Sequence, residues 1–327
     1  MIYDNHGRII NYLRLSVTDR CNLRCLYCMP QQGLDWVPSG ELMSYEEMLR
    51  LCSLLAQEGL EKVRITGGEP FIRRDLIHFL SALVKIKGIK KVSITTNGIL
   101  LGPFIPTLKS LGIQSINLSL DTINRQRFFA ITRRDELPAV MSTLESLLSH
   151  GMDVKINAVV MEGRNTEDII ELTGLTKELP VSVRFIEEMP FNGDGHDFSG
   201  LHWNHTRILE YIKAFYPDVQ KIPDPPFSTS YNYSIPGHIG SFGIIAAYSR
   251  SFCGTCNRIR VTPQGTVKTC LYGEGVLNVK DLFREGLSDS AIKGKLMDVF
   301  QKRAADGWEA DKIKSTEVHP SMSEIGG

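Results

Sequence analysis

The sequence predicts an α/β fold: an incomplete (βα)6 TIM-like barrel followed by a β-rich C-terminal extension. Three observations indicate this fold. Short β-branched runs alternate with amphipathic helical runs from residue 12 to residue 187, as in successive βα units of a parallel sheet. Each predicted strand alternates apolar and polar residues, whereas parallel strands covered on both faces read as continuous apolar runs. After residue 190 this alternation ends and β-like segments follow.

Six barrel strands are expected. They span residues 12–17, 62–66, 91–96, 115–121, 154–160 and 181–187. Because successive side chains of a strand point to opposite faces, each strand has one apolar and one polar face. The helices must cover the apolar face, so the polar face lines a wet interior. A closed eight-stranded barrel fills its lumen with branched apolar side chains, so an open barrel fits these strands better.

Helices are expected between the strands. The first spans residues 44–57, opens with the capping-box pair Ser44 and Glu47, and ends before Gly59. The others are expected over residues 75–87, 103–111, 137–150 and 166–178. The fourth helix closes at Gly151, as a helix C-cap does.

The C-terminal part is predicted to be organised differently. Its expected elements are a helix near 204–216, a proline-rich loop at 222–227, β structure over 231–271, and helices at 278–286 and 288–304. A hairpin turn is expected at Pro263-Gln264-Gly265. The chain therefore divides into three predicted regions: 1–190 as the partial barrel, 191–230 as a linker with a helix, and 231–327 as the extension.

Composition excludes two classes of partner. The 327 residues carry 37 Lys+Arg and 37 Asp+Glu, so no field of the whole molecule attracts a nucleic-acid polymer or an anionic membrane. The first residues lack the uninterrupted apolar core of a signal peptide, and no run of about 18 apolar residues occurs. We therefore expect a cytoplasmic protein.

Six of the seven cysteines fall into two triads. The N-terminal triad, C-x3-C-x2-C, is Cys21, Cys25 and Cys28, and the C-terminal triad, C-x2-C-x13-C, is Cys253, Cys256 and Cys270. Clustered thiols in a reducing compartment indicate metal binding more often than disulfides. Structural zinc takes four protein ligands, whereas a [4Fe-4S] cluster held by three cysteines leaves one iron open. The alternative is two zinc knuckles completed by a remote histidine such as His6 or His238. Cys52 lies in an apolar helical stretch and is expected in the core.

Basic side chains fall on the polar strand faces. On four strands these are Arg14, Arg64, Lys155 and Arg184, and Arg258 and Arg260 follow the C-terminal triad. We expect all six to point into one cavity, and buried cations without a partner are costly, so the cavity requires a polyanion. A nucleoside triphosphate, with about four negative charges, suits guanidinium pairing. Solvated surface positions are expected for Arg73, Arg74, Arg133 and Arg134.

These motifs resemble those of the radical S-adenosylmethionine enzymes. The N-terminal triad has an aromatic residue before its last cysteine and follows the first strand, and Gly67-Gly68-Glu69-Pro70 follows the second. In that family the open iron binds the amino and carboxylate groups of S-adenosylmethionine, which one electron cleaves to a 5′-deoxyadenosyl radical. The resemblance implies that S-adenosylmethionine is bound by Tyr27, Gly67, Gly68, Glu69, Ser119 and Met189.

The resemblance extends along the chain to the family of GTP 3′,8-cyclases. It is carried by residues 18–30, 64–76, 95–98, 117–121, 184–187 and 252–265 and by the terminal Gly-Gly. It implies two [4Fe-4S] clusters and cyclisation of GTP to (8S)-3′,8-cyclo-7,8-dihydro-GTP, the first step of molybdenum cofactor biosynthesis. The implied GTP contacts are Arg14, Arg64, Thr95, Lys155, Arg184, Arg258 and Arg260. The implied catalytic residues are Cys21, Cys25, Cys28, Arg258, Arg260, Gly326 and Gly327.

The same resemblance implies partners. These are a flavodoxin- or ferredoxin-like electron donor and cyclic pyranopterin monophosphate synthase, which takes the product, with a homodimer as one alternative for the oligomeric state. Two other functions stay open. A radical S-adenosylmethionine enzyme that modifies peptides usually carries more cysteines in its auxiliary motif. A non-catalytic metal-binding module leaves the Gly-Gly-Glu-Pro segment and the inward basic residues without a role.

Overall fold

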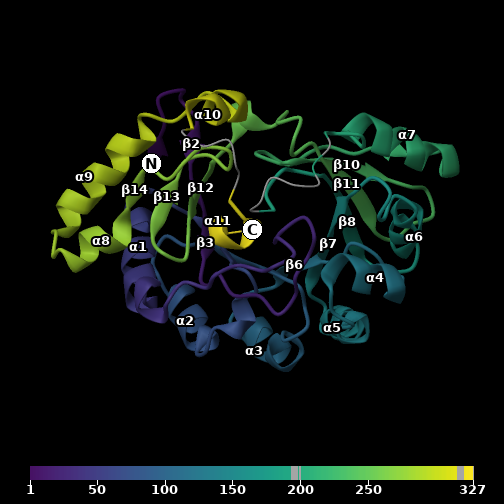
Figure 1. Cartoon of the computed structure of the whole chain (residues 1–327), viewed down its shortest axis with the longest axis horizontal. Helices are drawn as coiled ribbons and strands as arrows, with labels where there is room; N and C mark the ends of the chain where they lie inside the picture. Colours follow the sequence, from purple (N-terminus) through teal and green to yellow (C-terminus); the bar gives the residue numbers. More distant parts are fainter. Residues whose placement is uncertain (193–197, 199, 315–319, 327) are drawn as a thin grey trace.

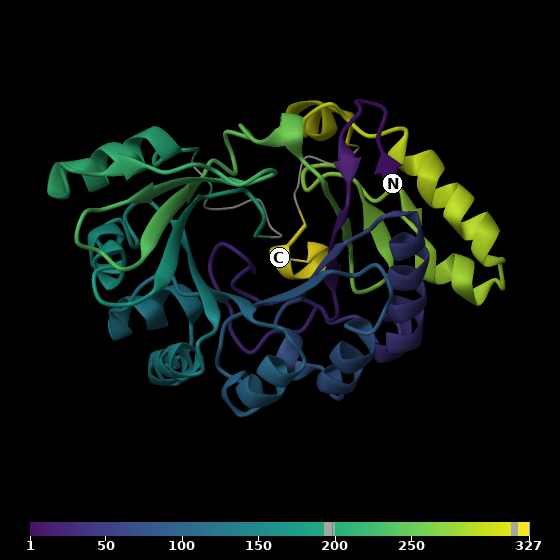
Figure 2. The same ribbon diagram turned by 180° about the vertical axis from the view of Figure 1, so that it is seen from behind.

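The predicted barrel strands lie side by side in one curved sheet, which two opposite views show (Figures 1 and 2). The computed structural model describes residues 1–192, 198, 200–314 and 320–326. Within these ranges, twelve strands join in the order β14-β13-β12-β3-β4-β5-β6-β7-β8-β11-β10-β9. Because this order ends at two separate edge strands, the barrel is open, as the sequence predicts.

The central strands run parallel. They are β12 (Arg258–Val261), β3 (Tyr12–Ser16), β4 (Lys62–Thr66), β5 (Lys91–Thr96), β6 (Ser115–Ser119), β7 (Asp153–Val160), β8 (Val181–Glu187) and β11 (Ser241–Ile245). Six of them are the predicted barrel strands. The other two, β12 and β11, come from the C-terminal extension and pair with β3 and β8 at the two sides of the barrel. The sequence does not predict this extension of the sheet, because parallel pairing between distant segments leaves no local pattern.

Antiparallel strands finish the edges of the sheet. They are β13 (Thr266–Lys268) and β14 (Leu277–Asn278) on one side, and β10 (Ser230–Ser234) and β9 (Gln220–Lys221) on the other. The predicted hairpin at 263–265 joins β12 to β13, and Gly265 adopts the left-handed conformation with φ 87° that its turn requires. A separate ribbon near the N-terminus consists of β1 (Ile2–Tyr3) and β2 (Ile9–Ile10).

Helices cover the outer face of the sheet (Figure 1). They are α1 (Tyr45–Glu58), α2 (Leu76–Leu83), α3 (Ile105–Ser110), α4 (Arg125–Thr132), α5 (Leu137–Ser149), α6 (Asp168–Leu175), α7 (His205–Phe215), α8 (Val279–Arg284) and α9 (Asp289–Phe300). Two further helices, α10 (Gly307–Ile313) and α11 (Met322–Ile325), follow in the C-terminal segment. The predicted capping box of α1 is present between Ser44 and Glu47. Three helices, α4, α10 and α11, were not predicted, since they are short and carry no long apolar stripe. Among the described helices, none has the length and apolar character needed to cross a membrane.

The two faces of the strands differ as predicted. Leu13, Leu15, Val63 and Ile65 are fully buried under the helices, and Cys52 lies in the same core. The intervening residues of these strands face the interior of the barrel. The C-terminal segment enters this interior, where α11 lies near the centre in both views (Figures 1 and 2).

The start of β11 generates a stability prediction. A side chain on Gly240 would place its Cβ closer than 3.0 Å to the carbonyl oxygens of Val181 and Leu179. We expect Gly240→Ala to lower the free energy of unfolding by about 1–3 kcal/mol, because the strand must move away from β8. The control is Gly294→Ala in α9, where an added Cβ meets nothing within 4 Å beyond its own stretch of helix. This change should raise the free energy of unfolding by about 0.5–1 kcal/mol. Urea denaturation measures both, and equal effects would contradict this packing.

Candidate active site

The barrel interior contains a cavity of about 580 Å³ that both cysteine triads line. The N-terminal triad follows β3, and the C-terminal triad precedes and follows the β12–β13 hairpin. β12 lies between β3 and β13 in the sheet and pairs with both. The fold therefore brings together thiols from the two ends of the chain around a single space.

The loop of the N-terminal triad is held by the glycine-rich turn after β4. The backbone N–H of Gly68 donates to the Thr18 carbonyl at 2.8 Å, and that of Glu69 donates to the Arg20 carbonyl at 2.8 Å. A Cβ on Gly67 or Gly68 would collide with the backbone of the cysteine loop. Both positions therefore require glycine for this close approach.

Glu69 has a buried side chain that does not line the cavity. Its carboxylate accepts hydrogen bonds from the Thr96 hydroxyl at 2.8 Å and from the Asn97 backbone at 2.7 Å. Burial raises the pKa of Glu69 to about 7. The side chain thus connects the turn to the end of β5, while its backbone faces the cysteine loop.

One cysteine of the C-terminal triad, Cys256, differs electrostatically from the N-terminal triad, whereas burial raises the pKa of Cys253 as it does those of the N-terminal thiols. Burial raises the pKa of Cys21 to about 12 and that of Cys28 to about 11. Burial also acts on Cys256, but the charges of Arg258 and Arg303 outweigh it and lower the pKa of that thiol to about 6. A bound metal deprotonates cysteine ligands, so the N-terminal thiols need the charge of the metal, whereas Cys256 is poised as a thiolate.

The arrangement of thiols fits iron–sulfur clusters better than zinc. In the described part of the chain, no three His, Cys, Asp or Glu side chains are arranged to hold a single metal ion. The cysteines of a [4Fe-4S] cluster each bind a different iron, so their sulfurs need not converge on one point. His6 contacts the Arg303 carbonyl at 2.9 Å and His238 contacts the Thr176 hydroxyl at 2.7 Å, and neither histidine lines the cavity.

Cations stand in a row across four neighbouring strands. In the sheet register Lys268 lies opposite Arg260, Arg260 opposite Arg14, and Arg14 opposite Arg64. We call these four residues the cation row. Burial and the charge of Arg260 hold the pKa of Arg14 well below its usual value, and burial and Arg258 lower that of Arg260 to about 10. Like charges directly opposite each other destabilise a sheet, so the row favours an anionic ligand.

Further cations complete this basic surface. Arg184, Lys155 and Arg258 line the cavity, as predicted, and burial lowers the pKa of Arg184 to about 10. Lys62 and Lys91 also line it and were not predicted. Both lie an even number of residues from a cavity-facing residue on the same strand, so strand alternation could have found them.

Tyr12 is a further cavity residue that was not predicted. Its hydroxyl accepts a hydrogen bond from Arg64 Nε at 2.5 Å. Burial alone would raise its pKa, but Arg64, Arg14 and Lys62 lower it to about 7. Three cations therefore surround this phenol on the cavity side.

The other predicted site residues lie around the same cavity. The structure places Tyr27, Gly67, Gly68, Thr95, Ser119 and Met189 in its lining. The Tyr27 hydroxyl donates to Asp121 at 3.0 Å. Gly326, with φ 84°, accepts a hydrogen bond from the Thr66 hydroxyl at 2.9 Å, so the tail reaches the end of β4. Gly327 lies outside the described residues.

Two expected surface charges are structural instead. Arg73 donates to the carbonyls of Val17 at 2.6 Å and Met43 at 2.7 Å, and Arg133 donates to that of Arg24 at 3.1 Å. The prediction of solvated positions was wrong for both, because loop carbonyls need donors where the loops pack on the barrel. Arg74 and Arg134 are exposed, as predicted.

The cation row generates a binding prediction. Arg14→Met and Arg260→Met each remove one charge and keep an apolar stem. We expect each to weaken binding of inorganic tripolyphosphate by about tenfold or more, because a hydrogen bond to a charged group contributes about 1.5–3 kcal/mol. Titration calorimetry measures the affinity. The control is Arg125→Met, which removes an exposed arginine paired with Asp135. Unchanged affinity in both row variants would contradict a polyanion site.

Comparisons with known proteins agree with this geometry. Residues 15–175 match the Radical SAM superfamily, and residues 181–307 match Molybdenum Cofactor Synthesis C. The chain is 39% identical to the GTP 3′,8-cyclase of Clostridium perfringens, with 99% of each protein covered. It is 38% identical to the mitochondrial GTP 3′,8-cyclase of Arabidopsis thaliana, covering all of this chain and 84% of that protein.

Other matches cover less or are more distant. Human molybdenum cofactor biosynthesis protein 1 is 39% identical over 88% of this chain, which spans 45% of the human protein. The fold resembles Streptococcus suis SuiB bound to S-adenosylmethionine, with a TM-score of 0.60 and 17% identity over 87% of this chain and 68% of that one. The full-length matches above 30% identity show that the chain belongs to the GTP 3′,8-cyclase family of radical S-adenosylmethionine enzymes.

Proposed function

We propose that the protein cyclises GTP to (8S)-3′,8-cyclo-7,8-dihydro-GTP, with S-adenosylmethionine and two [4Fe-4S] clusters, as the first step of molybdenum cofactor biosynthesis. The observation that carries this proposal is the cation row, of which Arg14, Arg64 and Arg260 line the cavity that both cysteine triads also line. The relatives named GTP 3′,8-cyclase support the same reaction.

The N-terminal triad would hold the cluster that binds S-adenosylmethionine. When bound, that cluster supplies the electron that cleaves S-adenosylmethionine to the 5′-deoxyadenosyl radical. The residues proposed to bind S-adenosylmethionine are Tyr27, Gly67, Gly68, Glu69, Ser119 and Met189. The glycines and Glu69 act through their backbone, since the turn lies directly against the cysteine loop.

The basic residues would bind the triphosphate of GTP. The proposed contacts are Arg14, Arg64, Thr95, Lys155, Arg184, Arg258 and Arg260, to which the structure adds Lys62 as a candidate. The C-terminal triad, Cys253, Cys256 and Cys270, would hold a second cluster against the guanine. A substrate held at both ends leaves its ribose toward the N-terminal triad, in an enclosed space where few orientations are open to it.

The C-terminal tail completes the proposed site. Gly326 hydrogen-bonds to Thr66, beside the turn that contacts the N-terminal cysteine loop. This contact supports a catalytic position for Gly326, and the cavity lining supports one for Arg258 and Arg260. The same role for Gly327 rests on the family resemblance alone. Five further points stay predictions. They are an electron donor of flavodoxin or ferredoxin type, product transfer to cyclic pyranopterin monophosphate synthase, a homodimer, a cytoplasmic location and the three-region division at 190 and 230. The peptide-modifying and non-catalytic alternatives leave the cation row without a ligand.

Anaerobic reconstitution tests this function. The reconstituted protein should contain about eight irons per chain, as two [4Fe-4S] clusters require. It should consume S-adenosylmethionine and GTP together and release 5′-deoxyadenosine and a cyclised nucleotide, measured by mass spectrometry. Zinc in place of iron would exclude all radical functions. 5′-Deoxyadenosine formed without any conversion of GTP would favour the peptide-modifying alternative.

A further inference from the structure

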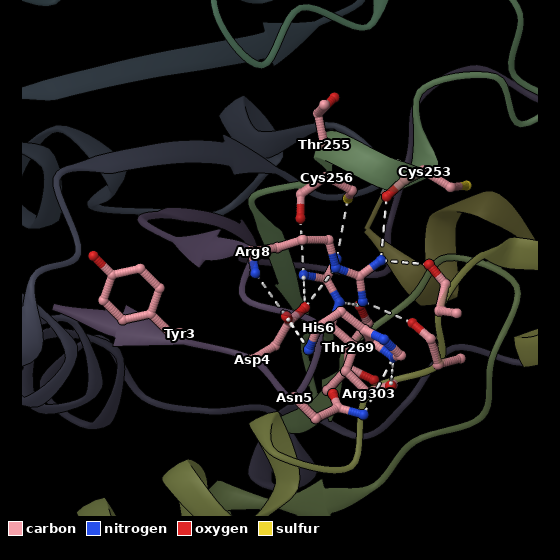
Figure 3. A network of polar contacts seen from close by, with 12 residues as sticks. Tyr3, Asp4, Asn5, His6, Arg8, Cys253, Thr255, Cys256, Thr269 and Arg303 are labelled. Carbon is pink, nitrogen blue, oxygen red and sulfur yellow. Dashed lines mark hydrogen bonds and ion pairs between the residues drawn. The ribbon is translucent and has the colours of Figure 1, made fainter.

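A network of polar contacts joins the C-terminal triad to Asp4, Arg8 and Arg303, three residues that do not line the cavity (Figure 3). Its centre is the Asp4 carboxylate, which is 4% exposed. Asp4 Oδ2 accepts from Arg8 Nε at 2.6 Å and pairs with Arg303 Nη1 at 3.4 Å. We call these three residues the Arg8–Asp4–Arg303 clamp. It joins the N-terminal ribbon to the segment that follows α9.

Arg303 makes the contacts that reach the cysteines. Its guanidinium donates to the carbonyls of Cys256 at 2.9 Å, Arg258 at 3.0 Å and Thr269 at 3.0 Å. These carbonyls belong to the two segments that carry Cys256 and Cys270. The side chain is buried, so all of these bonds are shielded from water. One planar group therefore sets the spacing between two ligands of the triad.

Arg8 holds the third cysteine of the triad. Its Nη1 donates to the Cys253 carbonyl at 3.2 Å and to that of Ala305 at 2.5 Å, and its Nη2 donates to that of Ala304 at 2.7 Å. The clamp thus contacts every backbone segment that carries a cysteine of the triad. Asp4 fixes the relative position of the two guanidinium groups, since both use the same carboxylate oxygen.

One contact of the clamp goes to the sulfur itself. Arg303 Nη2 donates to Cys256 Sγ at 3.0 Å. Arg258 also acts on this thiol and lines the cavity, whereas Arg303 reaches it from the buried side. Hydrogen bonds and positive charge at a ligand sulfur stabilise the reduced, more negative form of an iron–sulfur cluster. If Arg303 only held the backbone segments together, it would not need a hydrogen bond to the sulfur.

We propose that Arg303 is a positioning residue of the C-terminal cluster, which sets the spacing of its cysteines and raises its reduction potential through Cys256, with Asp4 orienting the guanidinium. The inference rests on the proposed function only in that this triad must bind an iron–sulfur cluster. It predicts that the N-terminal Asp4 supports a metal site formed by residues more than 240 positions away.

The test uses the full chain with Cys21→Ala, Cys25→Ala and Cys28→Ala, so that only the C-terminal cluster is reconstituted. Arg303→Met removes the charge and all donors, and Arg303→Lys keeps the charge but loses the planar fork. Redox titration followed by electron paramagnetic resonance should show a lower midpoint potential and altered g values in both, with the larger shift in Arg303→Met. Asp4→Asn should lose iron to a chelator several-fold faster than the parent chain.

Arg50→Met is the matched control, because Arg50 also joins distant segments through an ion pair with Asp289 but lies on the surface. Its potential and iron retention should equal those of the parent. Unchanged potential and g values in both Arg303 variants would overturn the inference, even if their melting temperatures fell. If the parent chain, which carries only the three Cys→Ala changes of the N-terminal triad, binds no iron, the proposed function is overturned, and this inference with it.

Discussion

Repulsion between cations that lie opposite each other in the sheet is the constraint on which the site depends. Arg260, Arg14 and Arg64 occupy opposed positions on three adjacent strands, with Lys268 next in register. Like charges directly opposite each other destabilise a sheet, so these positions favour an anionic ligand that offsets the repulsion. The open barrel supplies the space, because charged and polar side chains share the lining with apolar ones and leave a cavity, whereas a closed eight-stranded barrel is filled by branched apolar side chains. The fold thus accepts a local cost in stability to make an anion site.

The C-terminal extension adds the second cysteine triad to the cavity, so that a triad lies at each end of the site. Its strand β12 adds Arg258 and Arg260 beside β3 and carries the C-terminal triad to the cavity. The Arg8–Asp4–Arg303 clamp contacts that triad from the side away from the cavity. Its residues come from the first and last parts of the chain. Charged residues therefore have two roles on this side of the barrel. Arginines that face the cavity repel each other and favour an anionic ligand, whereas the paired charges of the clamp support the cysteines.

Local pattern predicted the elements and much of the cavity. Alternation located the six barrel strands and the inward direction of Arg14, Arg64, Lys155 and Arg184, because strand side chains follow a fixed period. What it could not supply was pairing between distant segments. The parallel pairing of β12 with β3, the row formed with Lys268, and the contact of Asp4 with Arg303 all join residues that no local period relates. Arg73 and Arg133 were misjudged for the same reason, since their partners are carbonyls of other loops.

The central claim is that the cavity holds a nucleotide by its two ends, with its ribose toward the N-terminal triad. Turnover of GTP deuterated at C3′ tests this most directly, because only an atom held next to the radical source can be abstracted. We predict that the deuterium appears in 5′-deoxyadenosine, measured by mass spectrometry, and that deuterium placed at C8 of the guanine does not. 5′-Deoxyadenosine without deuterium from the C3′-labelled substrate would contradict the account.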